Sequence, residues 1–190
     1  MHRPRAILFD MDGTLTEPLL DFPRIKKEMG IGQRPILEAL AEMDPESRRA
    51  AELVLLRHEE DAAACSTLNS GCRELLSELE ALGIATALIT RNSRVSVNHV
   101  LSRHELAIRV LIARDDAPPK PDPRPLLLAC QQLGVKHVQA WMVGDGQYDV
   151  EAACAAGIPS IWISHGRTKS FDAEPWKTVR DLHELRALLG

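Results

Sequence analysis

The sequence lacks long apolar runs, has few aromatic residues, and contains no dense block of basic residues. No apolar run approaches the roughly 20 residues that a membrane-spanning helix requires, and the apolar stretch near the N-terminus is too short for a signal peptide. Aromatic residues make up 4% of the 190 residues, and the formal net charge is −4. A mildly acidic chain without a Lys/Arg cluster disfavours nucleic-acid binding. We therefore expect a cytoplasmic protein with neither a membrane nor a nucleic acid as its partner.

Cysteine is also scarce, and its four positions are scattered. Cys65, Cys72, Cys130 and Cys154 form no Cys-x-x-Cys pair, and no histidine lies near them at the spacing of a zinc site. Each lies beside apolar residues in a stretch with helical character. We predict four buried free thiols rather than disulfides or metal ligands.

The most informative stretch is Ile7–Thr14, in which an apolar run leads directly into two carboxylates, Asp10 and Asp12. The apolar run predicts a short buried strand, and Gly13 with Thr14 predicts a turn. Two carboxylates this close repel each other unless a cation or a shared proton relieves them. A solvated acidic turn is the alternative. A calcium loop of the EF-hand type is excluded because Leu15 stands where that loop needs glycine, and because a strand precedes the loop.

Residues 16–70 have no strand signal and predict an all-helical insertion. We expect short helices over 22–29 and 36–43, and a longer one that begins after Asp44, with Ala50, Leu53 and Val54 on its apolar face. The insertion carries 7 Lys/Arg and 11 Asp/Glu, so a strongly polyanionic substrate is disfavoured. The predicted domains are a core formed by residues 1–15 and 71–190, and a helical domain over 16–70.

From residue 71 onward, helical and strand patterns alternate strictly. Apolar runs predict buried strands, each separated from the next by a helical stretch, over 84–90, 110–112, 140–143 and 160–163. Ser93, Asp122 and Asp181 are predicted helix caps. Strands that alternate with helices indicate an α/β fold with a doubly wound parallel sheet.

Polar side chains follow several of the predicted strands. In an open α/β sheet the carboxyl ends of the strands border the ligand crevice. The carboxylates there suit a hard divalent cation such as Mg²⁺; a hydroxyl, a lysine and the N-terminus of the helix after Asn92 suit a phosphate group. The set comprises Asp10, Asp12, Thr90, Lys120, Asp145 and Asp149.

These residues resemble, in order and over nearly the whole chain, the motifs of the haloacid dehalogenase-like hydrolase superfamily. The matching motifs are Asp10-Met11-Asp12-Gly13-Thr14, then Thr90, then Lys120-Pro121, and finally Gly144-Asp145 with Asp149. Within this superfamily the sequence resembles the phosphatases that have a small helical cap, as in the phosphoglycolate phosphatase type. It implies a Rossmann-like core with the cap inserted after the first strand.

The resemblance also implies roles for the carboxylates. Asp10 would be the nucleophile that forms an aspartyl-phosphate, and Asp12 would be the general acid and base. Asp10, Asp145 and the backbone carbonyl of Asp12 would bind Mg²⁺, and Asp149 would position the lysine or a metal-bound water. Because the dehalogenase branch does not use an acid/base aspartate at the position of Asp12, phosphoryl chemistry is favoured.

The phosphate would be bound by Thr90, Arg91, Asn92 and Lys120. For Arg91 two interpretations stay open: contact with a substrate carboxylate or second phosphate, or exposure to solvent. A phosphonate-cleaving relative would need a lysine from the cap, and Lys26 and the adjacent lysine are expected to be solvated.

The sequence thus predicts a Mg²⁺-dependent phosphatase that hydrolyses a small phosphorylated metabolite. A phosphomutase shares the same core residues and is an alternative. A non-catalytic phosphoacceptor or regulatory domain is another, although the order of the motifs argues against a response-regulator receiver. The sequence does not predict the oligomeric state or the identity of the substrate.

Overall fold

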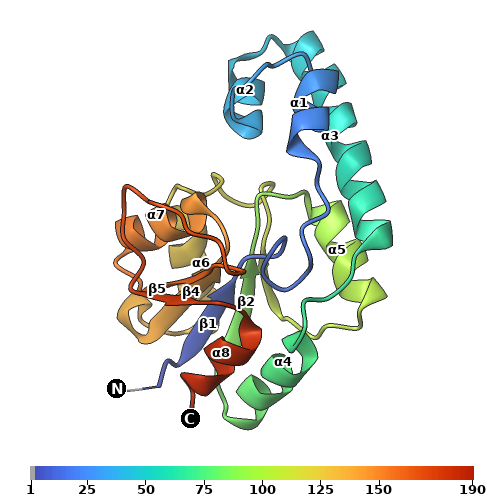
Figure 1. The fold of residues 1–190 in the computed structure, drawn as a ribbon. Helices are drawn as coiled ribbons and strands as arrows, with labels where there is room; N and C mark the ends of the chain where they lie inside the picture. The colour runs from blue at the N-terminus through green and yellow to red at the C-terminus, as the bar shows by residue number, and fades with distance from the viewer. Residues whose placement is uncertain (1–2) are drawn as a thin grey trace.

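The computed structural model describes residues 3–190, and a parallel β-sheet forms its centre (Figure 1). Within these residues six strands pair in the order β3-β2-β1-β4-β5-β6, all parallel. The order reverses beside β1, and such a switch point creates a ligand crevice at the carboxyl ends of the strands. The predicted doubly wound parallel sheet is confirmed. The strands are β1 Ala6–Phe9, β2 Ala85–Ile89, β3 Val110–Ile112, β4 Ala140–Gly144, β5 Ser160–Ile163 and β6 Lys177–Val179.

Strand β1 shows why the central strands are apolar throughout. Its side chains alternate between the two faces of the sheet: Ile7 and Phe9 join one hydrophobic cluster, and Ala6 and Leu8 join the other. Helices α4, α5 and α8 cover the first face, and α6 and α7 cover the second. Both faces are therefore buried. The helices are α4 Cys72–Ala81, α5 Arg94–Arg103, α6 Arg124–Leu133, α7 Gln147–Ala156 and α8 Leu182–Ala187.

The segment between β1 and α4 is helical, as predicted. It contains α1 Phe22–Glu28, α2 Ile36–Glu42 and α3 Pro45–Cys65. Figure 1 shows α1, α2 and the first part of α3 beyond one end of the sheet, while the rest of α3 runs beside α5. A separate hydrophobic cluster, which includes Ile25 and Leu55, holds the three helices together.

The predicted apolar face of α3 is wrong. Ala50 is exposed, and Leu53 is 63% exposed. The buried residues of α3 recur every four positions instead, at Ala51, Leu55, Glu59 and Ala63. Because a polar residue belongs to this buried row, the apolar pattern alone pointed to the wrong side of the helix.

Most of the predicted helix caps are confirmed, with one shift. The side chains of Asp44, Ser93 and Asp181 accept hydrogen bonds from backbone N–H groups in the first turns of α3, α5 and α8. Before α6 the N-cap is Pro123, one residue later than predicted. Asp122 still accepts from the backbone N–H of Arg124, at 2.9 Å.

The cysteine prediction holds only in part. All four thiols are free, and Cys72 and Cys130 are buried, but Cys65 and Cys154 are exposed. Helical periodicity could not assign their faces, because Cys154 has alanines on both sides and Cys65 follows three alanines at the end of its helix. No helix in residues 3–190 is long and apolar enough to cross a membrane.

Candidate functional site

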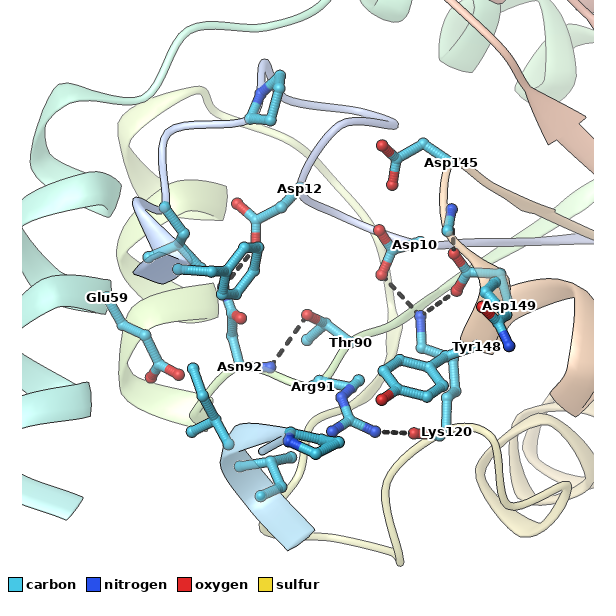
Figure 2. A pocket seen from close by; sticks show the side chains of 18 of the residues that line it. Asp10, Asp12, Glu59, Thr90, Arg91, Asn92, Lys120, Asp145, Tyr148 and Asp149 are labelled. Atoms are coloured by element: carbon cyan, nitrogen blue, oxygen red, sulfur yellow. Dashed lines mark hydrogen bonds and ion pairs between the residues drawn. The ribbon is translucent and has the colours of Figure 1, made fainter. Parts of the chain in front are cut away.

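A cavity of about 480 Å³ lies between the carboxyl edge of the sheet and the helical segment. All of the predicted site residues line it, from Asp10 and Asp12 after β1 to Asp145 and Asp149 after β4. Figure 2 shows these side chains converging from loops that are far apart in the sequence. The predicted convergence at one edge of the sheet is thus present in the structure.

A buried lysine connects two of the carboxylates (Figure 2). The Lys120 Nζ donates to Asp10 Oδ1 and Asp149 Oδ1, both at 2.6 Å, and to the backbone carbonyl of Ile89 at 2.7 Å. Burial lowers the pKa of Lys120, but the attraction of Asp10 and Asp149 outweighs burial and raises the pKa above its ordinary value. The lysine, which is 2% exposed, is therefore charged. Its charge holds Asp10 in position.

Three carboxylates form a potential metal site. Asp10, Asp145 and Asp149 each offer an oxygen within 4.8 Å of the others. Burial raises the pKa values of Asp10 and Asp145, and the neighbouring carboxylates raise them further, whereas Lys120 and Arg167 lower them. A cluster of carboxylate oxygens suits a hard divalent cation. The residues present fit Mg²⁺.

Gly13 makes room for this cluster. Its φ is +78°, and a Cβ at this position would lie 2.5 Å from Asp145 Oδ2. Its carbonyl accepts a hydrogen bond from the His165 ring nitrogen at 2.6 Å. Asp145 is also paired with Arg167, with Nη2 and Oδ2 3.0 Å apart. Sequence reasoning did not identify His165 or Arg167, because neither belongs to a recognisable motif.

Asp12 points to the other side of the cavity, toward the loop after β2. The Asn92 Nδ2 donates to Asp12 Oδ2 at 2.6 Å, and the Asn92 backbone N–H donates to Thr90 Oγ1 at 3.2 Å (Figure 2). Burial raises the pKa of Asp12 from 3.8 to about 6; Glu59 also raises it, whereas the Asn92 hydrogen bond lowers it. A carboxyl with this pKa can both donate and accept a proton near neutral pH.

Arg91 bridges the helical segment and the sheet edge. Its Nη2 donates to both carboxylate oxygens of Glu38 in α2, at 2.9 and 3.0 Å, and its Nη1 donates to the backbone carbonyl of Lys120. The guanidinium lies 4.3 Å from the centre of the Tyr148 ring. Of the two interpretations left open, solvent exposure is wrong, because the side chain is only 19% exposed. Sequence reasoning missed Glu38 and Tyr148.

Glu59 was also missed, although it is one of the most buried charged residues. It comes from α3 and is 2% exposed; it accepts from the Ser93 backbone N–H at 3.1 Å and pairs with Arg114. It therefore fixes α3 against the loop that carries Thr90 and Asn92. The available signal was a glutamate spaced four residues from Leu55 and Ala63 on the buried row of α3.

Comparison with known proteins identifies the family. Residues 21–163 match the family described as haloacid dehalogenase-like hydrolase. The chain is 30% identical to the N-acetylmuramic acid 6-phosphate phosphatase of Pseudomonas aeruginosa, with 86% of this chain and 83% of that protein covered. It is 31% identical to the phosphoglycolate phosphatase of Xanthomonas campestris, with 85% and 83% covered. A hydrolase from Pseudomonas syringae has the same fold, with a TM-score of 0.83, 20% identity, and 97% and 99% coverage. The family resemblance predicted from the motifs is thus confirmed: this chain belongs to the haloacid dehalogenase-like hydrolases.

Proposed function

We propose that this protein is a Mg²⁺-dependent phosphatase that hydrolyses a small phosphorylated metabolite through an aspartyl-phosphate on Asp10. The observation that carries the proposal is the contact between Asp10 and the buried Lys120, beside the carboxylates that fit Mg²⁺. The names of the relatives confirm the coarser part, a hydrolase of phosphoric monoesters of the haloacid dehalogenase-like type.

Asp10 is the proposed nucleophile. Its carboxylate attacks phosphorus, and the bond from phosphorus to the leaving oxygen breaks. Lys120 fixes the carboxylate and reduces its repulsion toward the incoming phosphate. Asp10 and Asp145, with the backbone carbonyl of Asp12, would hold Mg²⁺, and Asp149 keeps Lys120 in place. The cation, when bound, supplies positive charge that offsets the charge on the phosphoryl group.

Asp12 is the proposed general acid and base. It donates a proton to the leaving oxygen, which departs as an alcohol, and then removes a proton from the water that hydrolyses the aspartyl-phosphate. Its raised pKa suits both steps, because the protonated and the ionised carboxyl are both accessible near neutral pH. The Asn92 amide that donates to Asp12 limits the orientations of the carboxyl.

Thr90, Asn92 and Lys120 are the proposed phosphate-binding groups. Thr90 and Asn92 lie in the loop that leads into α5 and line the cavity. Arg91 was included in the predicted set, but Glu38 neutralises its guanidinium. We therefore assign Arg91 to the contact between α2 and the sheet edge.

The helices over residues 16–70 are the proposed cap, above a catalytic core of residues 1–15 and 71–190. Residues 1 and 2 of that predicted core lie outside the described residues. The separate hydrophobic cluster of α1–α3 supports this division. A cytoplasmic location remains a prediction. The relatives named as phosphatases support hydrolysis over the phosphomutase alternative, so hydrolysis is the function we propose.

The test is hydrolysis of a phosphomonoester panel by the purified protein with Mg²⁺. We expect activity that a chelator abolishes, and a loss on the order of 10³-fold or more in Asp10→Asn. Asp61→Asn, an exposed position on α3, is the matched control and should retain activity. Mass spectrometry should detect a phosphoryl group on Asp10. A panel without hydrolysis, or full activity in Asp10→Asn, would overturn the proposal.

A further inference from the structure

The contact between Arg91 and Glu38 determines more than the position of α2. We infer that Glu38 is a specificity-determining residue that occupies the carboxylate-binding edge of Arg91, so that the site favours phosphomonoesters whose leaving group carries no second anionic group. This inference rests on the proposed phosphatase function. It names the substrate class of that site.

The guanidinium of Arg91 lies in the cavity wall, and its N–H donors bind other groups of the protein. A guanidinium can bind a carboxylate through two parallel N–H donors. Here the Nη2 of Arg91 donates to both oxygens of Glu38, at 2.9 and 3.0 Å, and its Nη1 donates to the backbone carbonyl of Lys120, so both terminal nitrogens already bind groups of the protein. The ring of Tyr148 covers the guanidinium face. A substrate carboxylate could reach Arg91 only by displacing Glu38.

Displacement would be unfavourable because it places two carboxylates beside one guanidinium. Like charges that meet in a binding site disfavour the complex strongly. Arg91 is only 19% exposed, whereas Glu38 is 42% exposed. Arg91 lines the cavity and Glu38 is not among its lining residues, so Glu38 acts on an anionic substrate group by occupying the N–H donors of Arg91.

The other two cations in the wall, outside the Lys120 centre, also have partners within the protein. The Lys26 Nζ donates to the backbone carbonyl of Gln33 at 3.2 Å. The Lys169 Nζ lies 5.2 Å from the centre of the Phe171 ring. Lys169 is exposed, and Lys26 is half-buried with its hydrogen bond exposed to solvent, so both supply little directed attraction for a second anion.

The walls contributed by the helical segment are mainly apolar. They also include the Glu59 carboxylate, whose charge is paired with Arg114. An uncharged leaving group with apolar surface fits such walls, because its burial removes apolar area from water without leaving a charge unpaired. The apolar wall residues include Leu20, Phe22, Pro35, Ile36, Leu37 and Leu55.

Ethyl phosphate and phosphoglycolate form a matched pair of substrates, since they differ in a methyl group against a carboxylate. We expect the wild-type protein with Mg²⁺ to show kcat/KM at least about tenfold higher for ethyl phosphate. In Glu38→Gln the ratio of the two kcat/KM values should shift at least about tenfold toward phosphoglycolate, because Arg91 is then free to bind the phosphoglycolate carboxylate. The shift should disappear in the double variant with Arg91→Gln.

Glu42→Gln is the control, because Glu42 lies on the same helix and pairs with Arg34 away from the cavity. Glu42→Gln changes the net charge by the same amount as Glu38→Gln. It should leave the ratio of the kcat/KM values for the two substrates unchanged. Glu38→Asp keeps the charge and should retain the wild-type preference, which provides a second measurement if Glu38→Gln folds poorly.

The results distinguish this inference from the proposed function. A wild-type preference for phosphoglycolate, or an equal shift in Glu38→Gln and Glu42→Gln, would overturn the role of Glu38 but leave the phosphatase intact. A panel in which no phosphomonoester is hydrolysed would overturn both.

Discussion

Replacement of Asp12 by Asn should stabilise the metal-free protein at neutral pH while it removes activity. Burial raises the pKa of Asp12 from 3.8 to about 6 in the folded protein, whereas an unfolded chain returns it to about 3.9. The folded state therefore binds the proton more tightly than the unfolded state. The ionised carboxylate destabilises the fold at pH values above about 6. A difference of about two pKa units corresponds to at most about 3 kcal/mol, and partial contact with solvent reduces the effect.

The sign of the effect makes the prediction specific. As pH falls from about 6 to about 4, Asp12 becomes protonated in the folded state before the unfolded state, so the penalty disappears. Asparagine carries no charge and keeps an oxygen that can accept from Asn92 Nδ2. The gain of Asp12→Asn should therefore be about 1–3 kcal/mol at about pH 7.5 and close to zero at about pH 4.

The measurement is urea unfolding of the wild-type and variant proteins in the presence of a chelator at both pH values. Asp61→Asn, at an exposed position, controls for the loss of one negative charge and should change the free energy of unfolding by less than about 0.5 kcal/mol at either pH. A variant less stable than the wild-type protein at about pH 7.5 would refute the reasoning. So would a gain of the same size at both pH values.

Three further predictions follow from the packing. Gly13→Ala should weaken the response of activity to Mg²⁺ by about tenfold or more, because the new Cβ would lie 2.5 Å from Asp145 Oδ2 and the positive φ adds about 1–2 kcal/mol of strain; an unchanged Mg²⁺ titration would contradict it. Glu59→Gln should lower the free energy of unfolding in urea by about 3–5 kcal/mol, since it breaks the buried pair with Arg114. The exposed control Glu52→Gln should cost less than about 1 kcal/mol, and equal losses would argue against the buried pair. Finally, a thiol reagent should label two cysteines in the native protein and all four in denaturant; rapid native labelling of the buried pair would contradict the structure.

The central motifs could be predicted because each is a local pattern. The apolar run into Asp10 specifies a buried strand that ends in a carboxylate, and the run into Asp145 does the same for β4. The parallel topology then follows from the alternation of strands and helices, and it brings the strand ends to one edge. For these residues the sequence pattern and the tertiary arrangement agree.

Strand β6 lacked such a pattern. Lys177–Val179 is three residues long, and only Val179 is buried. Its pairing with β5 supplies the backbone partners that define it as a strand. Short edge strands of this kind carry too few apolar residues to be distinguished from a loop by periodicity.

The sequence by itself determined the order of the elements, the parallel sheet and the carboxylates at its edge, because hydrophobic periodicity and turn residues act over a few neighbouring positions. Only the tertiary structure decided the electrostatic partners around the cavity. Arg91 meets Glu38 across 53 positions of the chain, and Arg114 meets Glu59 across 55. A charged side chain selects its partner by proximity and burial after the chain has folded, and no local pattern encodes that choice. The motifs therefore specify the proposed chemistry, whereas the pairing of Arg91 with Glu38 determines which charges remain available to a substrate.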